Sequence, residues 1–385
     1  MPADREAIAV VGNGPVGLAA SVLLDRIGFA VTLVGPDEPR IDHRTSALLG
    51  GSVDFLGRLG VWEEIAALGA PLRTLRIVDA TGRLIRAPEV TFDASEIGRD
   101  AFGHNIPNAV LMRVLGEALD KSGVSRRRAL LTDLVPDEES VRLKLSAGED
   151  LVARLVVAAD GRRSQSREAA GISVRQWTYD QTALVANLVH GMPHDDVSTE
   201  FHTPDGPFTL VPLPGRRSSL VWVGRPANME ARAGLPDADL ADEIEKQSSS
   251  ILGPITIDGD CQIFPLSGMM AESLAANRVV LAGEAAHVFP PIGAQGLNLG
   301  YRDVAALGHI LTNPYADPGS PVHLARYRRL RSADVLLRSA GVNMVNRTLL
   351  SAFLPTQGLR GLGLFALDRV PPLRRTLMRQ LLSPA

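Results

Sequence analysis

The sequence has few cysteines, little net charge and no long apolar run, and each of these absences excludes a class of protein. Its single cysteine, Cys261, excludes an internal disulfide and a cysteine-based metal site, and it predicts a small core residue in a reducing compartment. The 40 basic and 43 acidic residues leave a net charge of −3, so we expect a small-molecule partner and no nucleic acid. No apolar run reaches the roughly 18 residues of a spanning helix, and no signal-peptide pattern precedes Ala7, so a cytoplasmic protein is expected.

What the sequence does contain is the alternation of an α/β enzyme. An apolar strand at 7–11, a glycine-rich turn, a helix pattern ending near Gly28 and a strand at 29–34 form a predicted βαβ unit. Further strands are expected to extend this sheet, at 129–135, 141–145, 151–159 and 278–282. Extended runs separated by Gly, Pro and Asp predict a second, antiparallel sheet, at 182–190, 197–203, 208–213, 218–223 and, after a helix near 238–252, at 262–266.

These patterns predict an α/β protein whose nucleotide-binding domain is discontinuous. That domain, with a mixed or parallel sheet, comprises residues 1–71, 93–175 and 267–313. An antiparallel substrate domain comprises a hairpin segment at 72–92 together with residues 176–266. Residues 314–385 are predicted to form a C-terminal helical region.

The first candidate site is the turn Gly12-Asn13-Gly14-Pro15-Val16-Gly17, between the first strand and the first helix. Backbone amides in such a turn can approach a pyrophosphate, and the helix N-terminus favours its negative charge. The context predicts dinucleotide binding over a glycine turn that serves packing alone. The acid that usually ends the second strand is missing, since that strand ends Val34-Gly35-Pro36. Asp37 is then either a ribose ligand or a solvated turn acid.

Two further motifs follow buried strands. One is Ala158-Ala159-Asp160-Gly161-Arg162-Arg163-Ser164, and the other begins Gly283-Glu284-Ala285-Ala286-His287 and runs through a glycine-rich loop to Gly300. Carboxylates at strand ends bind ribityl hydroxyls, and a helix N-terminus behind such a loop supplies amides to an electron-rich ring edge.

In order and spacing, these three segments resemble the GxGxxG, DG and GD signatures of the flavin monooxygenases typified by 4-hydroxybenzoate hydroxylase. The resemblance covers essentially the whole chain. Within that class, shorter motifs are similar to the hydroxylases of ubiquinone biosynthesis: Arg44-Thr45-Ser46-Ala47-Leu48, Leu59-Gly60-Val61-Trp62, Tyr179 to Val185, Phe201 to Pro207 and Phe264-Pro265-Leu266. The resemblance implies that the nucleotide is FAD, and that the enzyme uses NADH or NADPH and dioxygen to hydroxylate the ring of a polyprenylated phenol.

The resemblance also implies roles for individual residues. Those along FAD would be Gly12, Gly14, Pro15, Val16, Gly17, Arg44, Asn108, Asp160, Gly161, Gly283, Glu284, Leu297 and Asn298. Among these, Asp160 would also support the approach of NAD(P)H, and the backbone amides of Leu297 and Asn298 would face the pyrimidine end of the flavin ring. Pro291 and Gly293 would line the reaction side, which makes Pro291, Gly293, Leu297 and Asn298 the catalytic candidates.

Two residues of the third motif invite other interpretations. Glu284 replaces the family's usual aspartate, and it keeps the charge and the acceptor geometry at one extra methylene. Its presence leaves open an accessory protein that binds flavin without turnover. His287 is predicted to be a structurally bonded histidine, since no second ligand stands at metal spacing on the same segment, and no metal is expected.

The substrate is indicated by the strand at 208–214, which in benzoate-type relatives carries polar side chains that grip a carboxylate. Here it reads Phe208-Thr209-Leu210-Val211-Pro212-Leu213-Pro214, so a neutral, apolar substrate end is expected at Leu210, Val211, Leu213 and Pro291. The same leucines and valine are equally well explained as core residues. A hydroxylase of a small soluble aromatic is the rival enzyme.

A polyprenyl substrate lies in the bilayer, and the chain ends in an arginine-rich segment interleaved with apolar residues. Its arginines are Arg347, Arg360, Arg369, Arg374, Arg375 and Arg379. Such a segment predicts either a surface that docks on anionic lipid or a solvated face of core-packed helices. Partners in this interpretation are the prenylated phenol, dioxygen, a membrane surface and a ubiquinone-biosynthesis complex.

Overall fold

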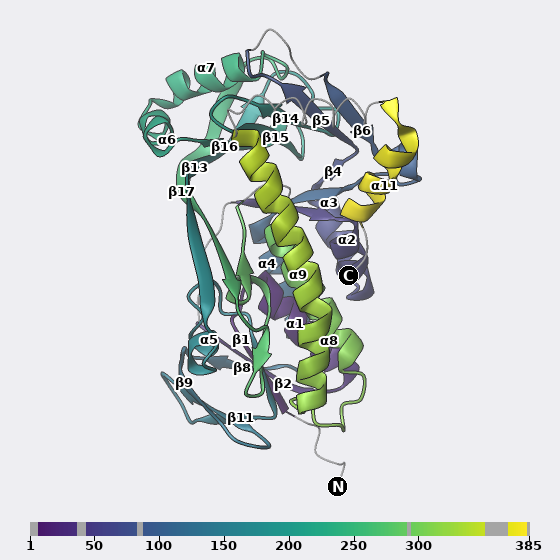
Figure 1. Ribbon diagram of the computed structural model, residues 1–385, viewed down its shortest axis with the longest axis vertical. Helices are drawn as coiled ribbons and strands as arrows, with labels where there is room; N and C mark the ends of the chain where they lie inside the picture. Colours follow the sequence, from purple (N-terminus) through teal and green to yellow (C-terminus); the bar gives the residue numbers. More distant parts are fainter. Residues whose placement is uncertain (1–6, 37–43, 83–87, 291–293, 351–368, 383–385) are drawn as a thin grey trace.

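The computed structural model describes residues 7–36, 44–82, 88–290, 294–350 and 369–382 (Figure 1). Two sheets dominate it and lie toward opposite ends of an elongated molecule, joined by two very long strands. Helix α9 runs along much of the length between them. This arrangement confirms the predicted α/β class with an additional antiparallel sheet and C-terminal helices.

The first sheet has six strands in the order β18-β19-β12-β1-β2-β8, and all pairs except β18–β19 are parallel. Its strands are β1 Ala7–Val11, β2 Ala30–Gly35, β8 Ser125–Arg128, β12 Leu155–Ala158, β18 Ala275–Ala276 and β19 Val279–Leu281. All residues of β12 and β19 are buried, as expected for strands covered on both faces. Helices α1 Pro15–Ile27, α4 Asn108–Asp120 and α8 Gln295–Ile310 belong to its helical layers. The predicted βαβ unit is confirmed.

The prediction that strands 129–135, 141–145 and 151–159 extend this sheet holds only for β12, the second part of the last segment, and is wrong for the rest. They form a separate antiparallel meander, β9 Leu131–Pro136, β10 Val141–Leu145 and β11 Leu151–Ala153. Buried and exposed residues alternate along β10, as in a sheet with one face exposed to solvent, whereas strands of the first sheet are covered on both faces. Strand β8 forms the edge of the first sheet instead. Its three arginines are exposed, and it was not predicted because it contains no apolar residue.

The second sheet has eight strands in the order β20-β17-β13-β16-β15-β14-β5-β6. Every pair is antiparallel except β14–β5. Its strands are β5 Thr74–Asp79, β6 Val90–Asp93, β13 Val174–His190, β14 Val197–His202, β15 Pro207–Leu213, β16 Arg217–Gly224, β17 Ile255–Ala271 and β20 His287–Val288. Strands β13 and β17 are each 17 residues long, far longer than predicted, because irregularities near Thr178 and Val185 broke the apolar alternation without breaking the strands.

The two faces of the second sheet are covered differently. Helices α6 Pro226–Ala233 and α7 Asp237–Gln247 pack on one face, over a cluster that includes Phe208, Leu210 and Trp222. The opposite face meets a small sheet of β3 Thr45–Leu49, β7 Gly103–Pro107 and β4 Ala70–Leu72. Thr45 Oγ1 donates to Ser219 Oγ at 3.0 Å, which ties that small sheet to β16.

The remaining helices complete the molecule. They are α2 Gly50–Arg58, α3 Trp62–Ala67, α5 Gln165–Ala169, α9 Pro321–Leu350 and α11 Pro371–Leu381, with short 3-10 turns at Ala94–Ile97 and Gly283–Ala285. Helix α11 buries Met378 against Phe92 and Phe102 beside β6 (Figure 1). Within the described ranges, no helix combines the length and the apolarity needed to cross a bilayer.

Tyr301 on α8 provides a test of polar burial in the core. Its side chain is 1% exposed, its ring lies 5.5 Å from that of Phe55, and its hydroxyl has no hydrogen-bond partner among the described residues. Burial raises the pKa of this phenol. Because removing an unsatisfied buried hydroxyl relieves a desolvation penalty, we expect Tyr301→Phe to be unchanged or about 1 kcal/mol more stable in urea unfolding. A clear loss of stability would reveal a partner for the hydroxyl.

Candidate active site

The first motif is a tight turn in which two glycines are required by contacts with the backbone. Gly12 has φ +110°, and a Cβ there would lie 2.2 Å from the carbonyl oxygen of Ala159. A Cβ on Gly17 would lie 1.8 Å from the carbonyl oxygen of Gly12. At Gly14 a Cβ would meet no atom within 4 Å, so this position faces open space in front of α1. The turn therefore leaves the backbone at a helix N-terminus open to approach, as a bound pyrophosphate requires.

The missing acid at the end of the second strand has a local explanation. A Cβ on Gly35 would lie 2.9 Å from Cβ of Asn13, and Asn13 Nδ2 donates to the carbonyl oxygen of Pro36 at 2.8 Å. Asn13 thus packs on the position where an acidic side chain would otherwise stand. Asp37, the alternative ribose ligand, lies outside the described residues.

The second motif is organised around Asp160 and an arginine that sequence reasoning missed. Asp160 accepts from Ser164 Oγ at 2.5 Å and from the Ser166 amide at 3.0 Å, which fixes the start of α5. Arg167, 3% exposed, donates to the carbonyl oxygen of Ala285 at 2.9 Å and to that of Arg162 at 3.1 Å. Arg167 therefore joins the second motif to the third. No local pattern distinguishes such a buried arginine from the exposed arginines beside it.

The third motif lies directly against the first. Gly283 has φ +62°, and a Cβ there would lie 3.1 Å from Cγ2 of Val16. The same methyl group would be 2.6 Å from a Cβ on Gly300, so Val16 packs between the turn and α8. Glu284 is exposed while Ala285 is fully buried, and the turn therefore presents the glutamate outward. His287 is buried and bonded to Asp303 at 2.8 Å, which confirms its structural role.

Asn298, near the start of α8, uses its whole side chain to hold neighbouring segments. Its Oδ1 accepts from the Leu49 amide at 2.9 Å and from Ser52 Oγ at 2.6 Å. Its Nδ2 donates to the carbonyl oxygens of Ala47 and Ala294, at 2.8 and 2.5 Å. Its side chain is thus engaged within the protein, and the contact of its backbone amide with the flavin ring stays a prediction. Pro291 and Gly293, by contrast, fall outside the described residues.

Arg44 and Asn108 come together beside this helix. The Asn108 amide donates to the carbonyl oxygen of Arg44 at 2.9 Å, and Ser46 Oγ donates to Asn108 Oδ1 at 2.6 Å. The guanidinium of Arg44 lies 5.6 Å from the centre of the Phe264 ring. Since Phe264 belongs to β17, these contacts bring the predicted cofactor residues next to the second sheet.

The predicted substrate residues divide between the two faces of that sheet. Leu210 is 2% exposed and belongs to the cluster under α6 and α7, which matches the alternative interpretation as core. Val211 points to the opposite face, because side chains alternate along a strand, and it pairs with Ser219. Leu213 shares the face of Val211 but is buried at the end of the strand.

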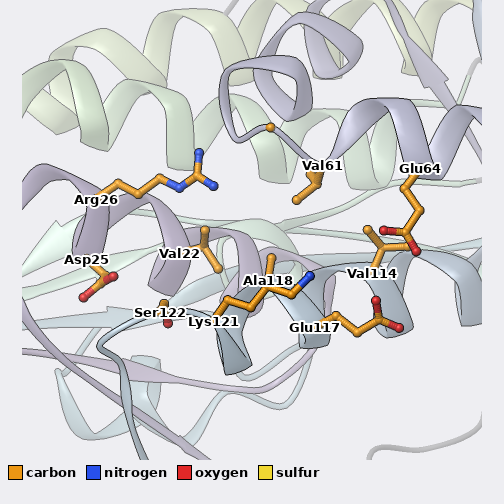
Figure 2. Close-up of a pocket in the computed structure, with 11 residues that line it drawn as sticks. Val22, Asp25, Arg26, Val61, Glu64, Val114, Glu117, Ala118, Lys121 and Ser122 are labelled. Carbon is orange, nitrogen blue, oxygen red and sulfur yellow. The ribbon is translucent and has the colours of Figure 1, made fainter.

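The surface pocket shown in Figure 2 is separate from these motifs. It holds about 240 Å³ between α1, α3 and α4, with Val22, Val114 and Ala118 beside charged side chains such as Arg26 and Lys121. Val22 lies eight residues beyond Gly14 along α1, roughly 12 Å at the helical rise. The pocket is therefore not the continuation of the GxGxxG turn. The described ranges contain no cluster of three residues suited to a metal ion.

The assembled motifs fit a flavin dinucleotide. Added Cβ atoms would meet open space at Gly14, Gly161 and Gly296, so three of the glycine-rich segments leave their backbone approachable. Two helices, α1 and α8, begin at these segments, and helix N-termini attract the negative charge of a pyrophosphate or of a reduced flavin ring.

Comparison with known proteins agrees with this geometry. A family model described as an FAD binding domain matches residues 5–337, and the chain belongs to that family. Two relatives cover nearly the whole chain. Ubiquinone hydroxylase UbiL of Rhodospirillum rubrum is 33% identical over 98% of this chain and 90% of its own. The 3-demethoxyubiquinol 3-hydroxylase of Escherichia coli is 34% identical over 98% of each.

Solved structures share the fold at lower identity. The p-nitrophenol 4-monooxygenase PnpA of Pseudomonas putida superposes with a TM-score of 0.80 at 20% identity over 98% of both chains. A variant of Klebsiella pneumoniae HpxO in complex with FAD gives 0.78 at 19% identity, also over 98% of both chains. The protein is thus an FAD-dependent monooxygenase, and the predicted cofactor and enzyme class are confirmed.

Proposed function

We propose that this monooxygenase hydroxylates the aromatic ring of a polyprenylated phenol in ubiquinone biosynthesis, with NADH or NADPH and dioxygen as co-substrates. The relatives named as ubiquinone and demethoxyubiquinol hydroxylases support the pathway. When bound, FAD supplies the redox chemistry that carries electrons to dioxygen and oxygen to the ring. The chain's own residues hold the cofactor, orient the phenol and exclude water.

The observation that carries the substrate class is the inner face of the second sheet. Its central strands present uncharged side chains toward the Arg44 segment: Ala183, Val185, Thr209, Val211, Val221, Val223, Gln262 and Phe264. Away from Arg44, which lies over Phe264, these side chains offer a carboxylate no opposite charge, and burying an ionised carboxylate against them would be costly. A phenol with an apolar tail matches the surface. Val211 is therefore the proposed substrate residue of the predicted group, with Thr209 and Val221 beside it.

One observation favours the rival, a small polar aromatic. His202 Nε2 and Glu200 Oε1 are 2.8 Å apart on β14, and Glu200 pairs across the strands with Thr209. This polar pair borders the apolar surface one strand further out. If the substrate were a soluble acid or amine, Glu200→Gln would change its KM, whereas KM for a prenylphenol should stay the same.

The remaining site assignments are part of the same proposal. Pro291, Gly293, Leu297 and Asn298 would border the reacting ring, and Glu284 would contact the ribityl chain. The FAD domain would consist of 1–71, 93–175 and 267–313, and the substrate domain of 72–92 and 176–266. Strands β13 and β17 cross both divisions, since they pair from Val174 with Ala271 to His190 with Ile255.

The electron donor would approach beside the DG motif. A pocket of about 360 Å³ lies there, lined by Arg162, Trp177 and Ser267 among others. An arginine and an indole ring are suited to the phosphate and the ring of a nicotinamide dinucleotide. Asp160 anchors the backbone next to this pocket, which is the support proposed for it.

Helix α11 supports a peripheral membrane contact. Met378 and Leu382 face the core, while Leu373, Val370, Arg375 and Arg379 are exposed. An exposed apolar and basic surface of this kind binds anionic lipid. We expect Arg375→Glu with Arg379→Glu to weaken binding to phosphatidylglycerol vesicles about tenfold. The double variant Arg127→Glu with Arg142→Glu changes the net charge equally at exposed positions of β8 and β10. This control should bind the vesicles like the original protein. Equal loss in both variants would contradict a specific surface.

The decisive experiment is the visible spectrum of the purified protein, followed by anaerobic addition of NADPH or NADH. We expect flavin bands that bleach faster when a short-chain prenylphenol is present. Bleaching accelerated only by small soluble phenols would favour the rival enzyme. Flavin bands that neither donor bleaches would support an accessory role, the alternative that Glu284 left open.

A further inference from the structure

The third motif is held from inside by one buried carboxylate. Asp303, on α8, is 1% exposed, and its Oδ2 accepts from the Gly283 amide at 2.9 Å and from His287 Nε2 at 2.8 Å. It therefore binds both ends of the turn that presents Glu284. Its second oxygen, Oδ1, accepts from Nε of Arg331, a residue of α9, at 2.7 Å.

The charge of this carboxylate is compensated within the protein. Burial opposes ionisation of Asp303, but His287 and Arg331 outweigh it and hold its pKa below the ordinary value. Arg331 is itself 3% exposed and also binds Asp334, which accepts from Arg302 at 3.0 Å as well. Breaking one member of such a buried network leaves an uncompensated charge, which is far more costly than loss of a surface pair.

The orientation of the His287 ring depends on its hydrogen bond to Asp303. Nδ1 of His287 has no hydrogen-bond partner among the described residues, and the imidazole is fully buried against Phe289 at a ring distance of 5.6 Å. The bond to Asp303 is therefore the polar contact that fixes the ring in the described structure. Arg167 holds the middle of the same turn at Ala285.

Asp303 also connects the turn to a second cofactor segment. It lies on α8, whose N-terminus at Gln295 is eight residues, or roughly 12 Å, away along the same helix. One carboxylate thus sets the position of the Glu284 turn relative to the helix end that faces the flavin ring. Through Arg331, α9 is tied to both.

We propose that Asp303 is a positioning residue for FAD, and that Arg331 makes the C-terminal helix α9 part of cofactor binding. The inference rests on the assignment of the Glu284 turn and the α8 N-terminus to FAD. Asp303 itself does not touch the cofactor in this proposal. It fixes two segments that do.

The first test is Asp303→Asn, which keeps the size of the side chain and removes its charge. We expect the dissociation constant of FAD to rise about tenfold or more, because an amide cannot accept from His287, Arg331 and Gly283 together. The flavin midpoint potential and the shape of its visible bands should shift as well, since the ring end and the ribityl end would no longer be held in register. Arg331→Lys should retain more FAD affinity than Arg331→Met.

The control is Asp317→Asn, which breaks a partly buried ion pair outside the cofactor motifs. Asp317 accepts two hydrogen bonds from Arg278, each 2.8 Å long. This variant should lower the melting temperature while leaving the FAD dissociation constant and the flavin potential unchanged. FAD affinities that fall equally in Asp303→Asn and Asp317→Asn would overturn the proposal, because loss of general stability would then explain both.

A second pair of variants decides the matter if Asp303→Asn fails to fold. His287→Gln keeps an N–H donor toward Asp303, and His287→Leu removes it. We expect FAD affinity near the original in the glutamine variant and weakened in the leucine variant. Equal affinity in the two would also overturn the positioning role. An original protein that binds no FAD at all would instead contradict the proposed function.

Discussion

Gly14→Ala should leave the FAD-free protein as stable as the original while removing most of its FAD affinity. A Cβ at this position meets no protein atom within 4 Å, and the backbone already has the extended conformation that alanine adopts readily. The added methyl group would occupy the space through which a pyrophosphate approaches the amides of the turn. We expect a loss of about 100-fold in FAD affinity, a cost typical of overpacking a close contact. Fluorescence titration of flavin into the apoprotein would measure it.

Gly12→Ala should have the opposite effect, because here the added methyl group would clash with the protein backbone. Its Cβ would lie 2.2 Å from the Ala159 carbonyl oxygen, at a φ of +110° that side chains rarely adopt. We expect a loss of at least about 3 kcal/mol in the free energy of unfolding, with or without FAD. If Gly14→Ala destabilised the apoprotein as much as Gly12→Ala, the turn would serve packing alone.

Asn298→Leu should clearly destabilise the start of α8. It removes two acceptor contacts, with Leu49 and Ser52, and two donor contacts, with Ala47 and Ala294, and it leaves the hydroxyl of Ser52 in a buried position without this partner. At about 1 kcal/mol or more for each group left unsatisfied, we expect a loss of roughly 3 kcal/mol in unfolding free energy. Thermal unfolding of the apoprotein would measure this cost without any contribution from flavin.

Asn298→Asp separates structural from cofactor effects at the same position. Aspartate keeps the acceptor for the Leu49 amide and for Ser52, but it faces the carbonyl oxygen of Ala47 with a second acceptor. We expect an intermediate loss of stability. The new negative charge near the N-terminus of α8 should also disfavour the reduced, negatively charged flavin and lower its midpoint potential. An unchanged potential would show that this helix end does not face the flavin ring.

Motif spacing predicted the FAD cofactor, and the strand, turn and helix of the first motif, because their physics is local. A strand, a tight turn and a helix N-terminus are adjacent in sequence, so Gly12, Gly14 and Gly17 could be proposed as pyrophosphate residues before any tertiary structure was known. The apolar alternation likewise predicted most strands of the second sheet. The sequence shows that the acid expected after Val34 is missing. The packing of Asn13 on Gly35, which explains this, can be seen only in the tertiary structure.

Sequence reasoning failed where partners are distant or where a signal is absent. The contacts of Arg167 with Ala285 and of Arg331 with Asp303 join residues 118 and 28 positions apart, and surface arginines share their local patterns. Strand β8 has no apolar residue to announce it, although it forms the sheet edge. The sequence predicted the strand that contains Leu210 and Val211, and both were proposed as substrate residues. Which face of the strand packs against α6 and α7 could not be predicted from the sequence.

The paired strands β13 and β17 have a mechanical consequence for the whole enzyme. They run side by side over 17 residues each, roughly 55 Å at the usual rise per residue, from the nucleotide sheet to the helices at the far end. The two strands stay paired on both sides of the irregularities near Thr178 and Val185, so we expect the ribbon to deform by gradual bending and twisting. For the proposed long substrate, we therefore expect entry and product exit to involve short surface segments more than a change in the separation of the two ends of the molecule.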